Sequence, residues 1–159
     1  MPITDIKNYN FQDVVASIKN MLTKSSYDED VRQLAVEIIS HGEDPISAIY
    51  DWTKQNCKYV PDPQDAELFI SPIRMVKDFN EGKQIAGDCD DHALLNTALL
   101  RAVGINAHVA ILDTKGNGWD HATAVAYSNK LSREIFVDTT SQFPLGWTEK
   151  YVNRYDVGV

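Results

Sequence analysis

The chain has 159 residues, of which 43% are hydrophobic and 24% are charged. This composition is typical of a globular protein and excludes the disordered, collagen-like and coiled-coil classes. The length suits a single domain over residues 1–159. Fifteen Lys and Arg against 23 Asp and Glu leave a net charge of −8. Because no basic run interrupts this acidic composition, we expect neither nucleic acid nor an anionic membrane as a partner.

The sequence offers no signal for export or membrane anchoring. No window reaches the roughly 18 apolar residues of a membrane span, and the first ten residues lack the basic-then-apolar order of a signal peptide. We therefore expect the chain to be cytoplasmic when it is made. Two cysteines, Cys57 and Cys89, are too few for a disulfide framework and lack the close spacing of a zinc knuckle. They permit one disulfide bridge, but a reduced compartment is the simpler interpretation, so each is considered as a free thiol.

The N-terminal third predicts three helices. Apolar residues recur every three or four positions over 11–22 and again over 31–39, which indicates two amphipathic helices with core-facing stripes. Asp28 is a suitable N-cap for the second. Asp44 is the expected N-cap of a third helix, with Pro45 at its first position. A turn-rich connector follows over 61–84, in which three prolines disfavour long regular elements and residues 73–79 predict a short helix.

A further helix is predicted between residues 87 and 104. Its N-cap is Asp88, Cys89 lies in its first turn, and Gly104 ends it. The hydrophobic period then changes from 3.6 to 2, which predicts strands at 105–112, 119–127 and 135–138. Helices gathered in the N-terminal third and one helix leading into a largely antiparallel sheet predict an α+β fold.

Cys89 is the candidate nucleophile because the amides and the positive dipole end of a helix N-terminus favour a thiolate. Asp88, Asp90 and Asp91 oppose this effect by crowding the same turn with negative charge. Asp91 lies where it can complete a capping box with Asp88, which would occupy part of that charge. The three carboxylates also permit a hard-cation site, but an EF-hand loop needs further oxygen ligands. We expect no metal and no other cofactor.

The remaining thiol and three of the four histidines have simpler interpretations. Cys57 lies at a helix end with no activating neighbour, so we assign it to packing. His41 lies at a helix end, and His108 lies within a strand, where a histidine is usually structural. His92 is three residues after Cys89 and is the second candidate for a base.

His121 is the preferred base because of a predicted hairpin. A turn centred on Asn129 and Lys130 would place His121 directly opposite Asp138 on the neighbouring strand. A carboxylate there would hold the imidazole and stabilise its protonated form. A register shift of one residue would separate the pair.

The order Cys89, His121, Asp138 resembles the transglutaminase-like superfamily of the papain-like fold. The resemblance lies in the segments 87–94, 119–122 and 137–140, and the upstream segments 49–52 and 59–63 are similar to small bacterial and bacteriophage members. It covers residues 45–140 as a family core and leaves residues 1–44 as a helical N-terminal extension.

The resemblance implies that Cys89 is a nucleophile, His121 a general base and Asp138 an orienting acid. It implies acyl transfer on an amide, with hydrolysis of a peptide or a peptidoglycan stem peptide as the expected outcome. Calcium activation is not carried over. The Cys89 amide and the Gln84 side chain are candidate oxyanion donors, and the flanking residues Asp88, His92 and Trp119 are further candidates for the oxyanion or substrate site.

Two alternatives stay open at this stage. A protein cross-linking transglutaminase would differ only in using an amine in place of water. A structural virion component could keep the fold and bind neighbouring phage proteins, and it would then be virion-associated. Trp119, Trp147 and Tyr151, if they are exposed near the site, would suit a ligand groove or a subunit contact.

Overall fold

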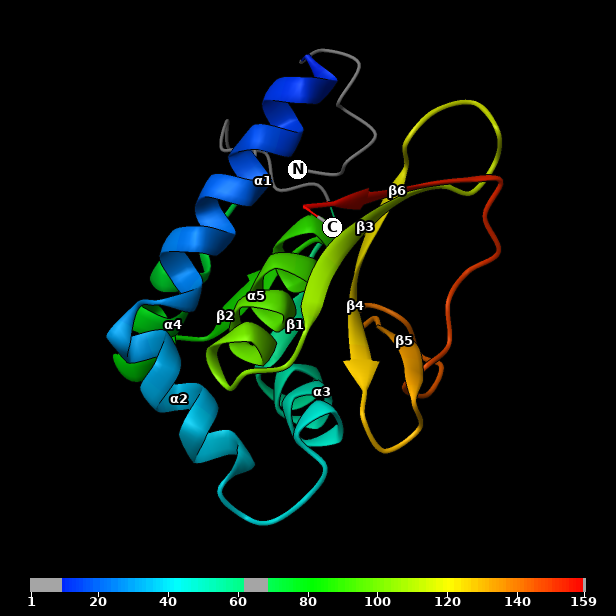
Figure 1. The fold of residues 1–159 in the computed structure, drawn as a ribbon. Helices are drawn as coiled ribbons and strands as arrows, with labels where there is room; N and C mark the ends of the chain where they lie inside the picture. The colour runs from blue at the N-terminus through cyan, green and yellow to red at the C-terminus, as the bar shows by residue number, and fades with distance from the viewer. Residues whose placement is uncertain (1–9, 62–68, 159) are drawn as a thin grey trace.

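The computed structural model describes residues 10–61 and 69–158. Helix α5 lies at the centre, with the other helices packed on one side and an antiparallel sheet on the other (Figure 1). The helices are α1 (Phe11–Ser26), α2 (Glu29–Ile39), α3 (Pro45–Asn56), α4 (Pro72–Asn80) and α5 (Cys89–Ala102). The strands are β1 (Cys57–Tyr59), β2 (Ile85–Gly87), β3 (Ala107–Asp113), β4 (His121–Ser128), β5 (Arg133–Val137) and β6 (Asn153–Val157). The α+β class is as predicted.

The predicted helix starts are confirmed at the level of single hydrogen bonds. The Asp28 side chain accepts from the Val31 amide at 3.1 Å, and the Asp44 side chain accepts from the Ser47 amide at 3.0 Å. The short helix expected over 73–79 is α4, while residues 62–68 of the predicted connector lie outside the described residues. In the part of the chain that is described, no helix is long and apolar enough to cross a bilayer.

The sheet has the strand order β5-β4-β3-β6, and every residue of β3 is buried. The three strands predicted from the sequence correspond to β3, β4 and β5. The sequence did not predict β6, which pairs antiparallel with β3, or the short parallel pair of β1 and β2. In that pair Tyr59 lies opposite Gly87, so β1 holds the chain that leads into α5.

The predicted hairpin register is wrong by two residues. Ser128 pairs with Arg133 and Ala124 with Val137, so the loop covers 129–132 rather than centring on Asn129 and Lys130. Ser132 takes a φ of +54° to close this longer loop. A shift of two residues keeps every side chain on its own face of the sheet. Asp138 therefore lies diagonally across from His121 instead of directly opposite.

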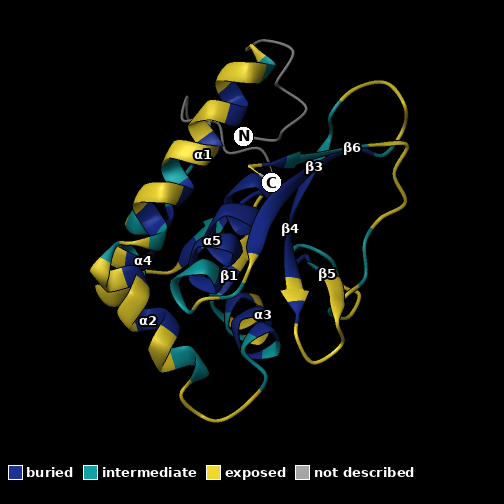
Figure 2. Ribbon diagram, in the orientation of Figure 1, coloured by how far each residue is buried: buried dark blue, intermediate teal, exposed yellow. Residues whose placement is uncertain are grey.

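The core runs through the whole described chain (Figure 2). It joins Val14 of α1, Val31 of α2 and Ile49 of α3 to α5 and to Val157 of β6. Helix α5 is buried on every side from Cys89 to Leu100. The N-terminal helices thus share one core with the rest of the fold and pack directly on α5.

Candidate active site

The predicted capping box at the start of α5 is present. The Asp88 side chain accepts from the Asp90 and Asp91 amides at 3.2 and 3.4 Å, and the Asp91 side chain accepts from the Asp88 amide at 3.1 Å. Asp91 also accepts from the Ile70 amide at 2.8 Å. Gly87 is required here, because a Cβ at this position would lie 2.5 Å from the Asp91 Cβ. These contacts fix Cys89 in the first turn.

The Cys89 thiol is buried. Only 6% of the residue is exposed, and the thiol donates to Oδ1 of Asp90 at 3.4 Å. Burial raises the pKa of Cys89 well above its ordinary value, the charges of Asp90 and Asp88 raise this pKa further, and a hydrogen bond from the Ala122 amide opposes them. Burial and the two neighbouring carboxylates therefore act against the helix N-terminus, which favours a thiolate.

His121 and Asp138 form a hydrogen-bonded pair, with Nε2 of the imidazole 2.8 Å from Oδ2 of the carboxylate. Asp138 is 6% exposed, and its Oδ1 accepts from the amide and the hydroxyl of Thr140 at 2.9 and 2.6 Å. Burial acts to raise the pKa of Asp138, but the hydrogen bonds from His121 and Thr140 outweigh it and leave the pKa below its ordinary value. Asp138 is therefore a carboxylate at neutral pH.

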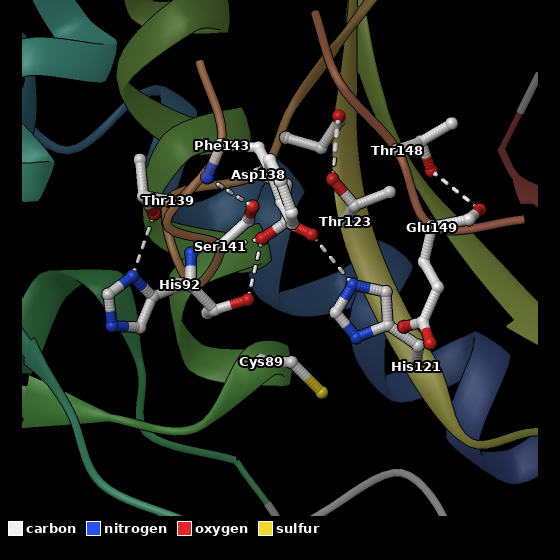
Figure 3. A network of polar contacts seen from close by, with 12 residues as sticks. Cys89, His92, His121, Thr123, Asp138, Thr139, Ser141, Phe143, Thr148 and Glu149 are labelled. Atoms are coloured by element: carbon white, nitrogen blue, oxygen red, sulfur yellow. Dashed lines mark hydrogen bonds and ion pairs between the residues drawn. The ribbon is translucent and has the colours of Figure 1, made fainter. Parts of the chain in front are cut away.

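The environment of His121 favours its protonated form. Burial acts to lower the pKa of His121, but the hydrogen bond and charge of Asp138 outweigh it, and the charges of Glu149 and Asp120 act in the same direction. The result is a pKa above the ordinary value. Figure 3 shows the Glu149 side chain lying beside the imidazole. An imidazolium formed here is thus stabilised.

The pair with Asp138 also fixes which nitrogen of His121 can act as a base. A carboxylate only accepts hydrogen bonds, so Nε2 carries the proton and the neutral ring keeps its lone pair on Nδ1. In Figure 3 the Cys89 side chain lies beside this imidazole, on the side of the nitrogen that is not bonded to Asp138. The three side chains come from the start of α5, the start of β4 and the residue after β5. The fold thus brings a thiol, an imidazole and a carboxylate together in one place.

His92, the second candidate base, is engaged elsewhere. Its Nδ1 lies 2.7 Å from the Thr139 hydroxyl, and its Nε2 lies 3.2 Å from the Lys58 carbonyl and 3.5 Å from the Cys57 sulfur. Burial lowers the pKa of His92, so the ring is neutral at neutral pH. Cys57 is buried, and burial together with the charge of Asp91 raises its pKa to about 12.

The other two histidines lie away from the thiol. His108 is a buried strand residue, and its Nε2 lies 2.7 Å from Oδ1 of Asp156 on β6. His41 is exposed in the segment after α2.

The remaining candidates also have other partners. The Gln84 amide nitrogen donates to the carbonyls of Asn56 and Ile85, both at 2.9 Å, so it has no N–H left for an oxyanion. Trp119 is half-buried and stacks on Phe11 at a centroid distance of 5.4 Å. Trp147 is also half-buried, whereas Tyr151 is 39% exposed.

Several residues near the site were missed by the sequence analysis. Thr140 follows Asp138 by two residues and was already part of the segment 137–140. Glu149 belongs to a segment without periodicity, and nothing in the sequence connects it to His121. Tyr59 was included only as part of a motif, yet its ring contacts that of His92 at a centroid distance of 6.3 Å, and its pKa is raised by burial and then by Cys89 and Asp88.

The acidic cluster consists of Asp88, Asp90 and Asp91. Asp88 and Asp91 cap the start of α5, and Asp88 and Asp90 raise the pKa of the thiol. Burial and then Asp88 raise the pKa of Asp91 to about 7, and burial and the same neighbour raise the pKa of Asp90 well above its ordinary value. Over residues 10–61 and 69–158, no three His, Cys, Asp or Glu side chains are grouped so that they could hold a metal ion.

The sequence matches the transglutaminase-like superfamily over residues 32–153, and the chain therefore belongs to this family. The match extends beyond residues 45–140 on both sides and takes in most of α2 and the first residue of β6. No curated protein matches the chain significantly.

Solved structures share the fold. A candidate cysteine protease from Cytophaga hutchinsonii is 28% identical with a TM-score of 0.55, over 82% of this chain and 45% of that one. A candidate protease from Parabacteroides distasonis is 15% identical with a TM-score of 0.62, over 82% of this chain and 26% of that one. The periplasmic domain of TgpA from Pseudomonas aeruginosa is 19% identical with a TM-score of 0.50, over 77% and 49%.

This chain spans less than half the length of each of these three structures. The family and the Cytophaga neighbour support a cysteine-type enzyme.

Proposed function

We propose that the protein hydrolyses an amide bond through a Cys89–His121–Asp138 triad and a thioester intermediate. The observation that carries the proposal is the 2.8 Å hydrogen bond from His121 Nε2 to Asp138, which leaves Nδ1 as the basic nitrogen of a ring that lies beside the Cys89 side chain (Figure 3). This is the orientation that nucleophilic catalysis by cysteine requires.

The proposed reaction begins from the neutral thiol. His121 Nδ1 takes the thiol proton as the sulfur attacks the amide carbonyl carbon, and Asp138 stabilises the resulting imidazolium. The imidazolium then protonates the leaving amine as the C–N bond breaks, which leaves a thioester on Cys89. Water, deprotonated by His121, attacks the thioester and releases the acid and the thiol. The raised pKa of Cys89 makes transfer to His121 part of the attack rather than a preceding equilibrium.

The backbone amide of Cys89 is the proposed oxyanion donor. It occupies the first position of α5, where an amide has no carbonyl four residues earlier within the helix. The same helix end carries a partial positive charge, which suits a developing oxyanion.

The proposed substrate is a peptide or a peptidoglycan stem peptide. Support comes from the similarity to a candidate cysteine protease and from a mechanism that needs only an amide carbonyl. Water is the proposed acceptor, and an amine acceptor would turn the same thioester into a cross-link.

The test is cleavage of defined peptides and of isolated stem peptides, read by mass spectrometry with acid quenching to trap an acyl group on Cys89. Cys89→Ser and His121→Ala should abolish both product and adduct. His108→Ala is the matched control, because His108 also pairs with an aspartate but lies on β3, away from the thiol. Products that persist in Cys89→Ser, or none from either substrate class, would contradict the proposal. A labelled primary amine recovered in the product would replace hydrolysis with transamidation.

A further inference from the structure

Asp138 lies just beyond the end of a strand, so the sheet does not position it fully. The last ladder pair of β4 and β5 is Ala124 with Val137. Beyond this pair, the Asp138 carboxylate bonds only to His121 and Thr140 among the hydrogen bonds found in the described residues. The next residue, Thr139, is 5% exposed and turns its side chain toward α5.

The Thr139 hydroxyl is bound by two side chains of α5. It lies 2.7 Å from Nδ1 of His92 and 2.9 Å from Nδ2 of Asn96 (Figure 3 shows the first contact). Both partners are buried, with exposed fractions of 1% and 0%. They follow Cys89 by three and seven residues, so all three side chains lie on one face of the helix.

The hydrogen positions in this group follow from the partners. The Asn96 amide nitrogen can only donate, so it donates to the Thr139 oxygen. The Lys58 carbonyl can only accept, so His92 carries its proton on Nε2 and accepts the Thr139 hydroxyl proton on Nδ1. A neutral His92, as its lowered pKa requires, satisfies each of these bonds.

We propose that His92, Asn96 and Thr139 form a positioning clamp that fixes Asp138, and through it His121, relative to Cys89. The inference rests on the proposed function, because it concerns the alignment of that triad. Helix α5 carries the nucleophile, and the clamp ties the residue next to the acid to the same helix. His92 also bonds to β1 through Lys58, so the clamp joins three segments that are distant in sequence. Among the hydrogen bonds found in the described residues, none joins these three side chains to Cys89 or His121.

The test replaces the Thr139 hydroxyl by a methyl group in Thr139→Val and follows the His121 imidazole by NMR titration. The pKa of His121 should fall in this variant, although Asp138, Asp120 and Glu149 are all retained. The kcat/KM for the cleaved peptide should fall by about 10- to 100-fold, mainly in kcat, because small misplacements of a catalytic group have effects of this size. Thr139→Ser keeps the hydroxyl and should restore both values.

Thr97→Val is the matched control. Thr97 is a buried threonine of α5 whose hydroxyl bonds to the Ala93 and His108 carbonyls, so this variant should leave the pKa of His121 unchanged. If Thr139→Val does not fold, Asn96→Leu removes the amide that donates to the Thr139 oxygen and should shift the pKa of His121 in the same direction.

A folded Thr139→Val protein with the wild-type pKa at His121 would overturn the clamp. An equal loss of kcat/KM in Thr97→Val would also overturn the clamp. Failure of the proposed function looks different: wild-type protein would form no acyl group on Cys89, while the titration would still report on the clamp.

Discussion

The thiol of Cys89 lies 3.4 Å from Oδ1 of Asp90, the residue that follows it on α5. Asp90 is 2% exposed and takes no part as an acceptor in the capping box, unlike Asp88 and Asp91. Its charge and its hydrogen bond both raise the pKa of Cys89. Burial is the largest cause of this raised pKa, and Asp90, a neighbour on the same helix turn, raises it further.

Asp90→Asn should therefore make Cys89 more reactive. Removing the carboxylate lowers the pKa of the thiol and increases the thiolate fraction, so iodoacetamide should label Cys89 several-fold faster at neutral pH. Mass spectrometry of the labelled peptide measures the rate. Asp30→Asn, an exposed change on α2, is the control and should have no effect. Slower labelling in Asp90→Asn would show that Asp90 activates the sulfur instead.

Asp138→Asn should reduce the acylation of Cys89 by a factor on the order of 10²–10⁴. The neutral amide removes the charge that stabilises the imidazolium and can hold the ring in the wrong tautomer. The rate of the acyl-enzyme step measures this loss. Asp156→Asn, which changes the equivalent partner of His108, should react at the wild-type rate. Similar losses in the two variants would mean that stability, not the charge beside His121, controls the rate.

The His121–Asp138 pair should stabilise the fold most between the ordinary pKa values of its members, 3.8 and 6.5. The raised pKa of His121 contributes stability that is complete below 6.5 and is lost as the pH rises through the folded-state pKa. The lowered pKa of Asp138 contributes stability that is complete above 3.8 and is lost as the pH falls. Urea unfolding of wild type and Asp138→Asn should thus differ more at pH 5 than at pH 9. A constant difference would refute the coupling.

Gly87→Ala should destabilise the protein by about 1–3 kcal/mol, as overpacking does. The added methyl group would lie 2.5 Å from the Asp91 Cβ and 2.7 Å from its Oδ2, so either the capping box or the β1–β2 pair must shift. Urea unfolding measures the free energy, and thiol labelling reports whether Cys89 moves. An unchanged free energy of unfolding would show that the backbone adjusts to the added methyl group without a loss of stability.

Local signals in the sequence predicted the helices well and the sheet less well. The caps at Asp28, Asp44 and Asp88 each require only a side chain and amides two or three residues away, so a short window contains the information. The hairpin loop depends on Ser128, whose hydroxyl accepts from the Leu131 amide, and on a positive φ at Ser132 without a glycine. Strand β6 forms by antiparallel pairing with β3, which is distant in sequence, so a short window does not contain the information.

The sequence also predicted one part of the candidate site and not another. Cys89, His121 and Asp138 could be selected from the residues and their order, and the shift of two residues left the last two on one face. The protonation of Cys89 could not be predicted, because it depends on burial by segments far away in the sequence. The contacts of Thr139 with His92 and Asn96 depend on tertiary packing in the same way.

Helix α5 is enclosed on all sides, and this determines how the molecule can lose function on heating. Segments with few buried contacts open locally at low free energy, whereas a fully enclosed helix opens only with the whole fold. The amides of α5 should therefore be among the slowest to exchange with deuterium. The thermal unfolding of α5 should coincide with the global melting of the protein.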